Sequence, residues 1–126
     1  MSRFPRLSTA QLSQIQTVTQ GGFWAACVLV LFAALGDAGA TAGFWDKGLH
    51  FTAFFTLATL GAVAYPGMRL RWIGLGLLTF GLAIEALQKL PFVAREASWA
   101  DFFADGLGVG FALVPIALER LRRQLM

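Results

Sequence analysis

The sequence predicts an all-α membrane protein, a bundle of four transmembrane helices with both termini in the cytoplasm. Its 126 residues are 57% hydrophobic and 13% charged, and the mean hydropathy is +0.66. Such a composition lies outside the range of soluble domains. The chain contains four apolar segments, each close to the roughly 20 residues that cross a bilayer. Lys and Arg gather at the ends of these segments, as they do in membrane proteins.

The first apolar segment runs from residue 7 to residue 36 without a charge, and its most apolar part is FWAACVLVLFAAL. A cleaved signal peptide is the alternative, because this core has a suitable length and Ala-Gly-Ala at 38–40 resembles a cleavage site. Arg3 and Arg6 stand too far upstream for a compact signal peptide, so we expect a retained helix. Residues 1–20 are predicted to form a cytoplasmic segment, with a short helix along the membrane surface as one option.

The other three segments are predicted to be helices as well. They comprise residues 48–65, 72–90 and 101–119. Pro66 and Gly67 close the second segment, as is typical after the end of a helix. None of the segments shows the alternation of polar and apolar residues that membrane-spanning strands require. Helices satisfy their own backbone hydrogen bonds, which lipid cannot do.

The orientation follows from the positive residues, which concentrate in short cytoplasmic loops. Seven lie on the side of the termini and of the loop between the second and third segments, and three lie on the other side. Both termini are therefore predicted to be cytoplasmic. Residues 21–119 then form the transmembrane domain, and residues 120–126 form a basic cytoplasmic tail.

The net charge of +3 and the pI near 9.8 would suggest nucleic acid in a soluble chain. Here the basic residues flank apolar segments, so membrane lipids with anionic headgroups are the predicted partners and nucleic acid is not. Cys27 is the only cysteine, which excludes an intrachain disulfide and a thiol pair for a metal. One histidine without a thiol is a poor zinc site. We expect neither a metal nor a cofactor.

Polar residues recur at the outer ends of the apolar segments. Asp46, Lys47 and His50 are spaced to share one side of the second helix. His50 lies one turn inside, and its short side chain must find a polar neighbour from another helix. Glu85 lies within the third segment, where an ionisable group costs on the order of 3 kcal/mol. We therefore expect Glu85 to face the interior of the bundle.

The fourth segment begins with two acidic residues one turn apart, Asp101 and Asp105. Like charges at this spacing repel each other unless a cation or a shared proton lies between them. Arg95 is the nearest base in the preceding loop. Ser98 and Asp101 have the spacing of a capping box, so the helix is expected to begin near Ser98 with Asp101 as its cap. The residues predicted to meet at the outer end are His50, Glu85, Arg95 and Asp105.

Small residues form two rows on the fourth helix. Ala104, Gly108 and Ala112 make one row, and Gly106 and Gly110 make the other. Such rows let membrane helices approach closely. We predict packing roles for them, with an oligomer as one option.

The order DKGLHF, IEALQ and REASWADFFADGLGVG resembles the VanZ-like family of small bacterial membrane proteins. The resemblance covers about residues 46 to 110. It implies a multi-spanning protein of the bacterial cytoplasmic membrane and the cell envelope, associated with resistance to glycopeptides such as teicoplanin. The family has no settled biochemical activity. Carried over by position, its polar residues are Asp46, Lys47, His50, Glu85, Gln88, Arg95, Ser98, Asp101 and Asp105.

Three classes of function remain open. In the first, the outer polar residues bind or protect an envelope component, such as the headgroup of a lipid-linked precursor or a glycopeptide. In the second, the chain is an intramembrane enzyme that uses His50 with Glu85, Asp101 or Asp105. No established catalytic motif supports it. In the third, the polar residues hold the helices of a structural or regulatory subunit together.

Overall fold

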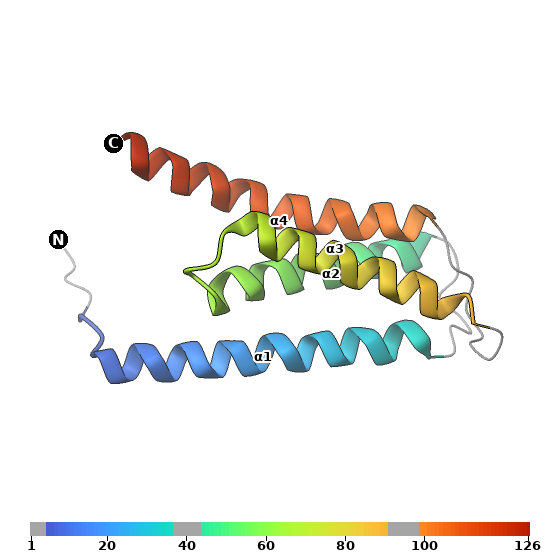
Figure 1. Ribbon diagram of the computed structural model, residues 1–126, viewed down its shortest axis with the longest axis horizontal. Helices are drawn as coiled ribbons and strands as arrows, with labels where there is room; N and C mark the ends of the chain where they lie inside the picture. Colours follow the sequence, from blue (N-terminus) through green and yellow to red (C-terminus); the bar gives the residue numbers. More distant parts are fainter. Residues whose placement is uncertain (1–4, 37–43, 91–98) are drawn as a thin grey trace.

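The computed structural model describes residues 5–36, 44–90 and 99–126, without the side chains of residues 44–46. The regular structure of these residues is entirely helical, which confirms the predicted all-α class. The four helices are α1 (Thr9–Leu35), α2 (Phe44–Ala64), α3 (Leu70–Gln88) and α4 (Trp99–Leu125). Successive helices run in opposite directions, so the start of α1, the α2–α3 turn and the end of α4 lie at the same end of the bundle (Figure 1).

Three of these helices, α1, α3 and α4, are long and apolar enough to cross a membrane. Their outward faces carry large apolar side chains, and on α4 Phe103, Leu107 and Phe111 are 56 to 69% exposed. A soluble protein rarely exposes so much contiguous apolar surface. Lipid could cover this surface, so the placement of the apolar residues agrees with three helices that are able to cross a membrane. Among the described segments, α2 does not belong to this set.

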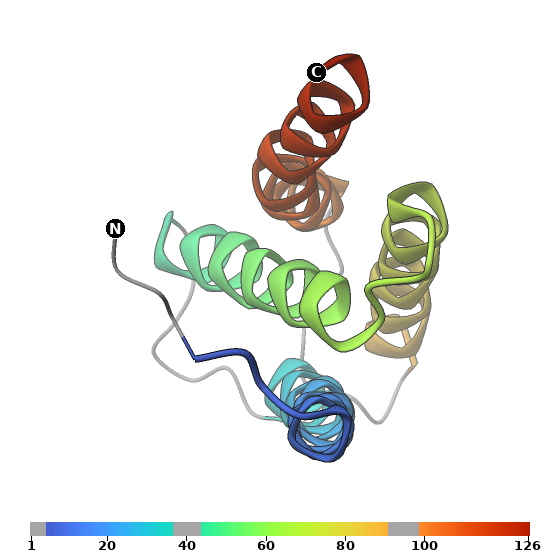
Figure 2. The same cartoon turned by 90° about the vertical axis from the view of Figure 1, so that its left-hand side faces the viewer.

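Helix α2 occupies the centre of the bundle. It packs against α1, α3 and most extensively α4, whereas α1 and α4 do not meet within the described ranges. The end-on view shows α2 with the other three helices around it (Figure 2). Phe54, Leu57 and Ala58 of α2 are fully buried. His50 lies on the covered part of α2, whereas Leu49, Phe55 and Val63 of the same helix are 40 to 55% exposed.

Helix α1 is a single helix of 27 residues, about 40 Å long. Residues 9–20 belong to this continuous helix rather than to a separate surface helix. Ser8 and Gln11 form a capping box at its start, with hydrogen bonds of 3.2 and 2.9 Å. Trp24 Nε1 donates to the Tyr65 hydroxyl at 2.8 Å, which joins α1 to the end of α2.

The predicted row of small residues on α4 lies against α2. Ala104, Gly108 and Ala112 are all buried. A Cβ atom at Gly108 would meet the carbonyl oxygen of Phe51 and would lie 2.9 Å from the amide nitrogen of Phe55. The absence of a side chain at Gly108 therefore sets how closely α4 approaches α2. This row is used within the chain, so the prediction of an oligomer now rests on Gly106 and Gly110.

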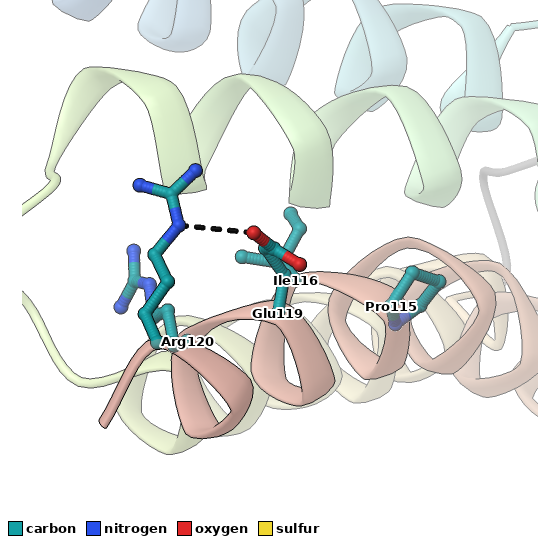
Figure 3. Close-up of a pocket in the computed structure, with 5 residues that line it drawn as sticks. Pro115, Ile116, Glu119 and Arg120 are labelled. Carbon is teal, nitrogen blue, oxygen red and sulfur yellow. Dashed lines mark hydrogen bonds and ion pairs between the residues drawn. The ribbon is translucent and has the colours of Figure 1, made fainter. Parts of the chain in front are cut away.

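The end of α4 carries the basic residues of the predicted tail, which are helical through Leu125. Arg123 Nε lies 3.0 Å from Glu119 Oε1, and Arg122 Nε lies 3.1 Å from Glu119 Oε2. These exposed pairs border a hollow of about 380 Å³ (Figure 3). Surface ion pairs of this kind contribute little to stability. The hollow is lined by Pro115, Ile116, Glu119, Arg120 and Arg123.

Candidate functional site

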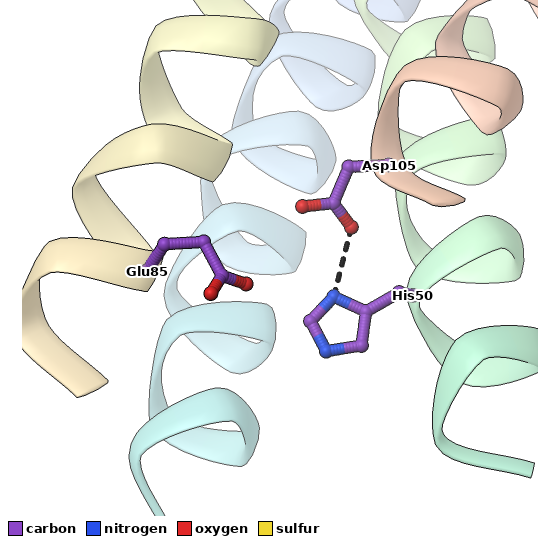
Figure 4. A group of neighbouring side chains, drawn as sticks. All are labelled: His50, Glu85 and Asp105. Atoms are coloured by element: carbon purple, nitrogen blue, oxygen red, sulfur yellow. Dashed lines mark hydrogen bonds and ion pairs between the residues drawn. The ribbon is translucent and has the colours of Figure 1, made fainter. Parts of the chain in front are cut away.

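Three helices bring polar side chains together at the end of the bundle opposite the termini. His50 comes from α2, Glu85 from α3 and Asp105 from α4, and their side chains point toward one another (Figure 4). One nitrogen or oxygen atom from each residue lies within 4.8 Å of those from the other two. The expected convergence of these three residues is confirmed. We call His50, Glu85, Asp101 and Asp105 the His–carboxylate cluster.

His50 forms a short polar contact with Asp105. Its Nδ1 lies 2.8 Å from Asp105 Oδ1. The ring nitrogen and the carboxyl group share this hydrogen bond, and the tautomer of the ring decides which of them donates. Nε2 lies 3.9 Å from Asp101 Oδ2. The imidazole ring therefore lies between two carboxylates of α4, and it has found the polar neighbour on another helix that the sequence required.

The acidic residues of the cluster are inside the protein. Asp105 is 0% exposed, Asp101 3% and Glu85 7%, and His50 is 8% exposed. Glu85 thus faces the interior of the bundle, as predicted. Asp101 belongs to the first turn of α4, where a carboxylate is stabilised by the helix dipole. Asp101 also lies near His50 of α2, and its predicted role as a helix cap stays a prediction.

Gly81 makes room for the cluster on α3. A Cβ atom at this position would lie only 3.0 Å from Asp105 Oδ2, so the Asp105 carboxylate packs directly on the α3 backbone. Sequence analysis assigned no site role to Gly81. The available signal was its spacing of four residues before Glu85, which puts both on the same face of α3.

Gln88 is buried, with 2% of its surface exposed. Its Nε2 donates to the backbone oxygen of Ala34 at 2.8 Å. Carbonyl groups at the end of a helix lack partners within the helix, so this bond satisfies one of them and joins α3 to α1. Gln88 therefore supports the bundle next to the cluster.

The remaining predicted site residues are not brought into the cluster by the described part of the chain. Lys47 is exposed at the start of α2. Asp46 belongs to α2, but its side chain is outside the description. Arg95 and Ser98 lie outside the described residues. Their predicted roles therefore stay predictions.

The cluster combines one histidine with three carboxylates in an apolar bundle. An isolated buried charge is costly, so such groups exist with a proton, a cation or hydrogen-bond donors beside them. Two kinds of chemistry suit the arrangement. An oriented imidazole can accept a proton or bind a metal, and buried carboxylates can bind a cationic or donor-rich group.

Comparison of this chain with models of protein families, with curated proteins and with solved structures finds no match. The resemblance to the VanZ-like family therefore remains a prediction from the sequence. The structure itself describes a helical bundle with three helices able to cross a membrane and a buried His–carboxylate cluster at one end.

Proposed function

We propose that this chain is a VanZ-like protein of the bacterial cytoplasmic membrane that spans it four times. In this proposal, the His–carboxylate cluster lies at the outer end and binds a polar group of an envelope component. The component is the headgroup of a lipid-linked precursor or a glycopeptide. The supporting observation is that one histidine and three carboxylates from three helices are buried together within an apolar bundle.

The acidic character of the cluster favours binding over a purely structural role. Neutral polar side chains can hold membrane helices together, at about 0.6 kcal/mol for an average hydrogen bond. Each ionisable group within a span costs on the order of 3 kcal/mol. Glu85 and Asp105 are therefore expensive means of joining helices. Binding of a cationic or donor-rich ligand group would compensate for the free-energy cost of placing Glu85 and Asp105 within the bundle.

An intramembrane enzyme is the second candidate, and one contact favours it. The 2.8 Å hydrogen bond between His50 Nδ1 and Asp105 Oδ1 orients the imidazole ring. Enzymes that use histidine as a general base orient it in the same way. Turnover of a lipid-linked precursor by the purified protein would distinguish this candidate from a binding protein.

Expression of the chain is expected to raise the teicoplanin concentration that inhibits growth of a susceptible Gram-positive host. The physical reason is that a protected envelope component is less available to the antibiotic. The measurement compares this strain with one that carries an empty vector, and an antibiotic with an intracellular target is the control. Binding of teicoplanin and of a soluble lipid-linked precursor analogue to the purified protein distinguishes the two ligands. Unchanged inhibition with no binding of either one contradicts the proposal.

The four-span topology predicts that both termini are cytoplasmic. Helix α2 is the deciding element, because a chain with only three spans would have its termini on opposite sides. A fusion of alkaline phosphatase after Met126 should be inactive, since this enzyme requires an oxidising compartment for its disulfides. The same enzyme inserted between residues 90 and 99 should be active. An active fusion at the C-terminus would contradict the topology and remove α2 from the set of spans.

A further inference from the structure

We propose that His50, Glu85 and Asp105, called here the triad, hold a divalent metal ion of the first transition row. Sequence analysis expected no metal, because one histidine and no thiol make a poor zinc site. The structure adds two carboxylates to that histidine at a single point. This inference goes beyond the proposed function, since metal binding requires no envelope ligand and is measured on the purified protein.

The spacing of the triad is close to that of a coordination shell. Nitrogen and oxygen ligands stand about 2.0 to 2.2 Å from such ions, so two ligands of one ion are separated by at most about 4.4 Å. The donor atoms of the triad lie within 4.8 Å of one another, and one pair is at 2.8 Å. A contraction of a few tenths of an ångström, which rotation of the Glu85 side chain can supply, is all that coordination requires.

The ion would replace the proton of the hydrogen bond between His50 and Asp105. His50 Nδ1 lies 2.8 Å from Asp105 Oδ1. An ion between these two atoms and Glu85 displaces that proton to solvent, as metal binding to histidine commonly does. Its double positive charge would then balance the two carboxylates within the apolar bundle, where the attraction between opposite charges is strong.

The donor set selects the kind of ion. One imidazole with two carboxylates suits Mn²⁺, Fe²⁺ or Zn²⁺, whereas soft ions prefer thiolates and Ca²⁺ or Mg²⁺ prefer oxygen alone. Three protein ligands leave coordination positions open, as in catalytic metal sites. An open position can accept a phosphate or carboxylate oxygen of a ligand, which gives an acidic cluster a means to bind an anionic group.

The surrounding helices hold the triad in place before an ion binds. Asp105 packs on the α3 backbone at Gly81, where a Cβ atom would be 3.0 Å from Oδ2. Gly108, one turn after Asp105, lies against the backbone of Phe51, the residue next to His50. All three triad residues are at most 8% exposed. Ligands that are fixed by packing lose little freedom when they bind a metal.

Titration of the purified wild-type protein with Mn²⁺ tests the proposal directly. The protein is solubilised in detergent, stripped with chelator and purified through a tag that contains no histidine. Electron paramagnetic resonance should show one saturable Mn²⁺ site per chain, with coupling to one imidazole nitrogen. Because the chain has only one histidine, this coupling identifies His50 without any substitution. A spectrum of hexa-aqua Mn²⁺ throughout the titration would overturn the proposal, as would bound Mn²⁺ without nitrogen coupling.

Three substitutions and a control locate the other ligands. His50→Ala, Glu85→Gln and Asp105→Asn should each weaken Mn²⁺ binding by more than about 100-fold, the upper limit for loss of a supporting residue. Glu119→Gln removes an exposed carboxylate at the opposite end and should leave binding unchanged. Equal affinity in all four variants overturns the triad as the site. If one of these ligand variants fails to fold, the nitrogen coupling in the wild-type spectrum still decides whether His50 binds Mn²⁺.

Gly81 supplies a variant that keeps all three ligands. Gly81→Ala crowds the Asp105 carboxylate and should weaken Mn²⁺ binding by about 10-fold. Gly76→Ala is its matched control, because a Cβ atom at Gly76 has no neighbour within 4 Å. Equal weakening by both substitutions would count against a preformed site. Neither test uses antibiotic susceptibility, so a failed metal site and a failed envelope function remain distinguishable.

Discussion

His50→Ala and Glu85→Gln are each expected to abolish the envelope phenotype while the amount of protein in the membrane stays near that of the wild type. His50 lies between Asp105 and Asp101 in the His–carboxylate cluster, so its loss removes the one imidazole of the chain. Glu85→Gln keeps the shape of the side chain and removes its charge. Both variants retain the apolar surface through which helices insert into lipid.

The alternative, in which the cluster only holds the helices together, predicts a different amount of folded protein for the same two variants. If the cluster only joins helices, loss of function should follow loss of folded protein, because breaking a buried polar pair costs about 3 to 5 kcal/mol. In the binding proposal, packing of the helices maintains the fold without the cluster, so the amount of folded protein stays near that of the wild type although function is lost. The binding proposal and the structural alternative therefore differ in how much of the phenotype remains for a given amount of folded protein.

The measurement compares teicoplanin susceptibility with the amount of detergent-solubilised protein that elutes as a single folded species. Glu119→Gln is the control, since Glu119 is exposed and pairs only with arginines of its own helix among the described contacts. It should match the wild type in both quantities. If His50→Ala or Glu85→Gln is present in normal amounts and gives the same teicoplanin susceptibility as the wild type, the basis for a functional site is removed.

The second large effect is expected at Gly108, where the backbones of α4 and α2 meet. Gly108→Ala places a Cβ atom against the carbonyl oxygen of Phe51 and 2.9 Å from the amide nitrogen of Phe55. These atoms belong to the main chain and cannot rotate away. Overpacking of this kind costs about 1 to 3 kcal/mol, and α4 must move outward to relieve it. Thermal unfolding in detergent should show a clear decrease in stability.

Gly110 provides the matched control on the same helix. A Cβ atom there has no neighbour within 4 Å, and alanine is favoured over glycine in a helix interior by about 1 kcal/mol in aqueous peptides. Gly110→Ala should therefore leave the unfolding temperature unchanged or raise it. Equal stability of the two variants would show that the close approach of α4 to α2 is not essential. Since Gly108 is one turn from Asp105, Gly108→Ala should also weaken Mn²⁺ binding.

Several features of the fold follow from local patterns. Pro66 and Gly67 stand just after α2, which ends at Ala64, and the apolar segments correspond to helices because lipid leaves backbone groups no other partners. Glu85 was expected to face the interior of the bundle because an ionisable side chain that faces lipid has a high free-energy cost. His50 was expected to need a polar neighbour on another helix, because its side chain is short and it lies one turn inside the second apolar segment.

Other features depended on how the helices pack. Nothing in the local sequence near Gln88 indicates that it donates to Ala34 at the end of α1, because that contact joins residues more than fifty positions apart. Lys47 shares a helix with His50 but is exposed, since the rotation of α2 decides which of its polar residues faces inward. The role of Gly81 depends on the position of Asp105 on another helix.

Composition and spacing along single helices were enough to predict the helical class, the apolar segments suited to a membrane and the residues that need polar neighbours there. Packing between helices places α2 at the centre, Asp105 beside His50 and Glu85 near the same point. These relations join groups on different helices. Their geometry depends on the close packing of backbones at Gly108 and Gly81, which periodicity within one segment cannot specify.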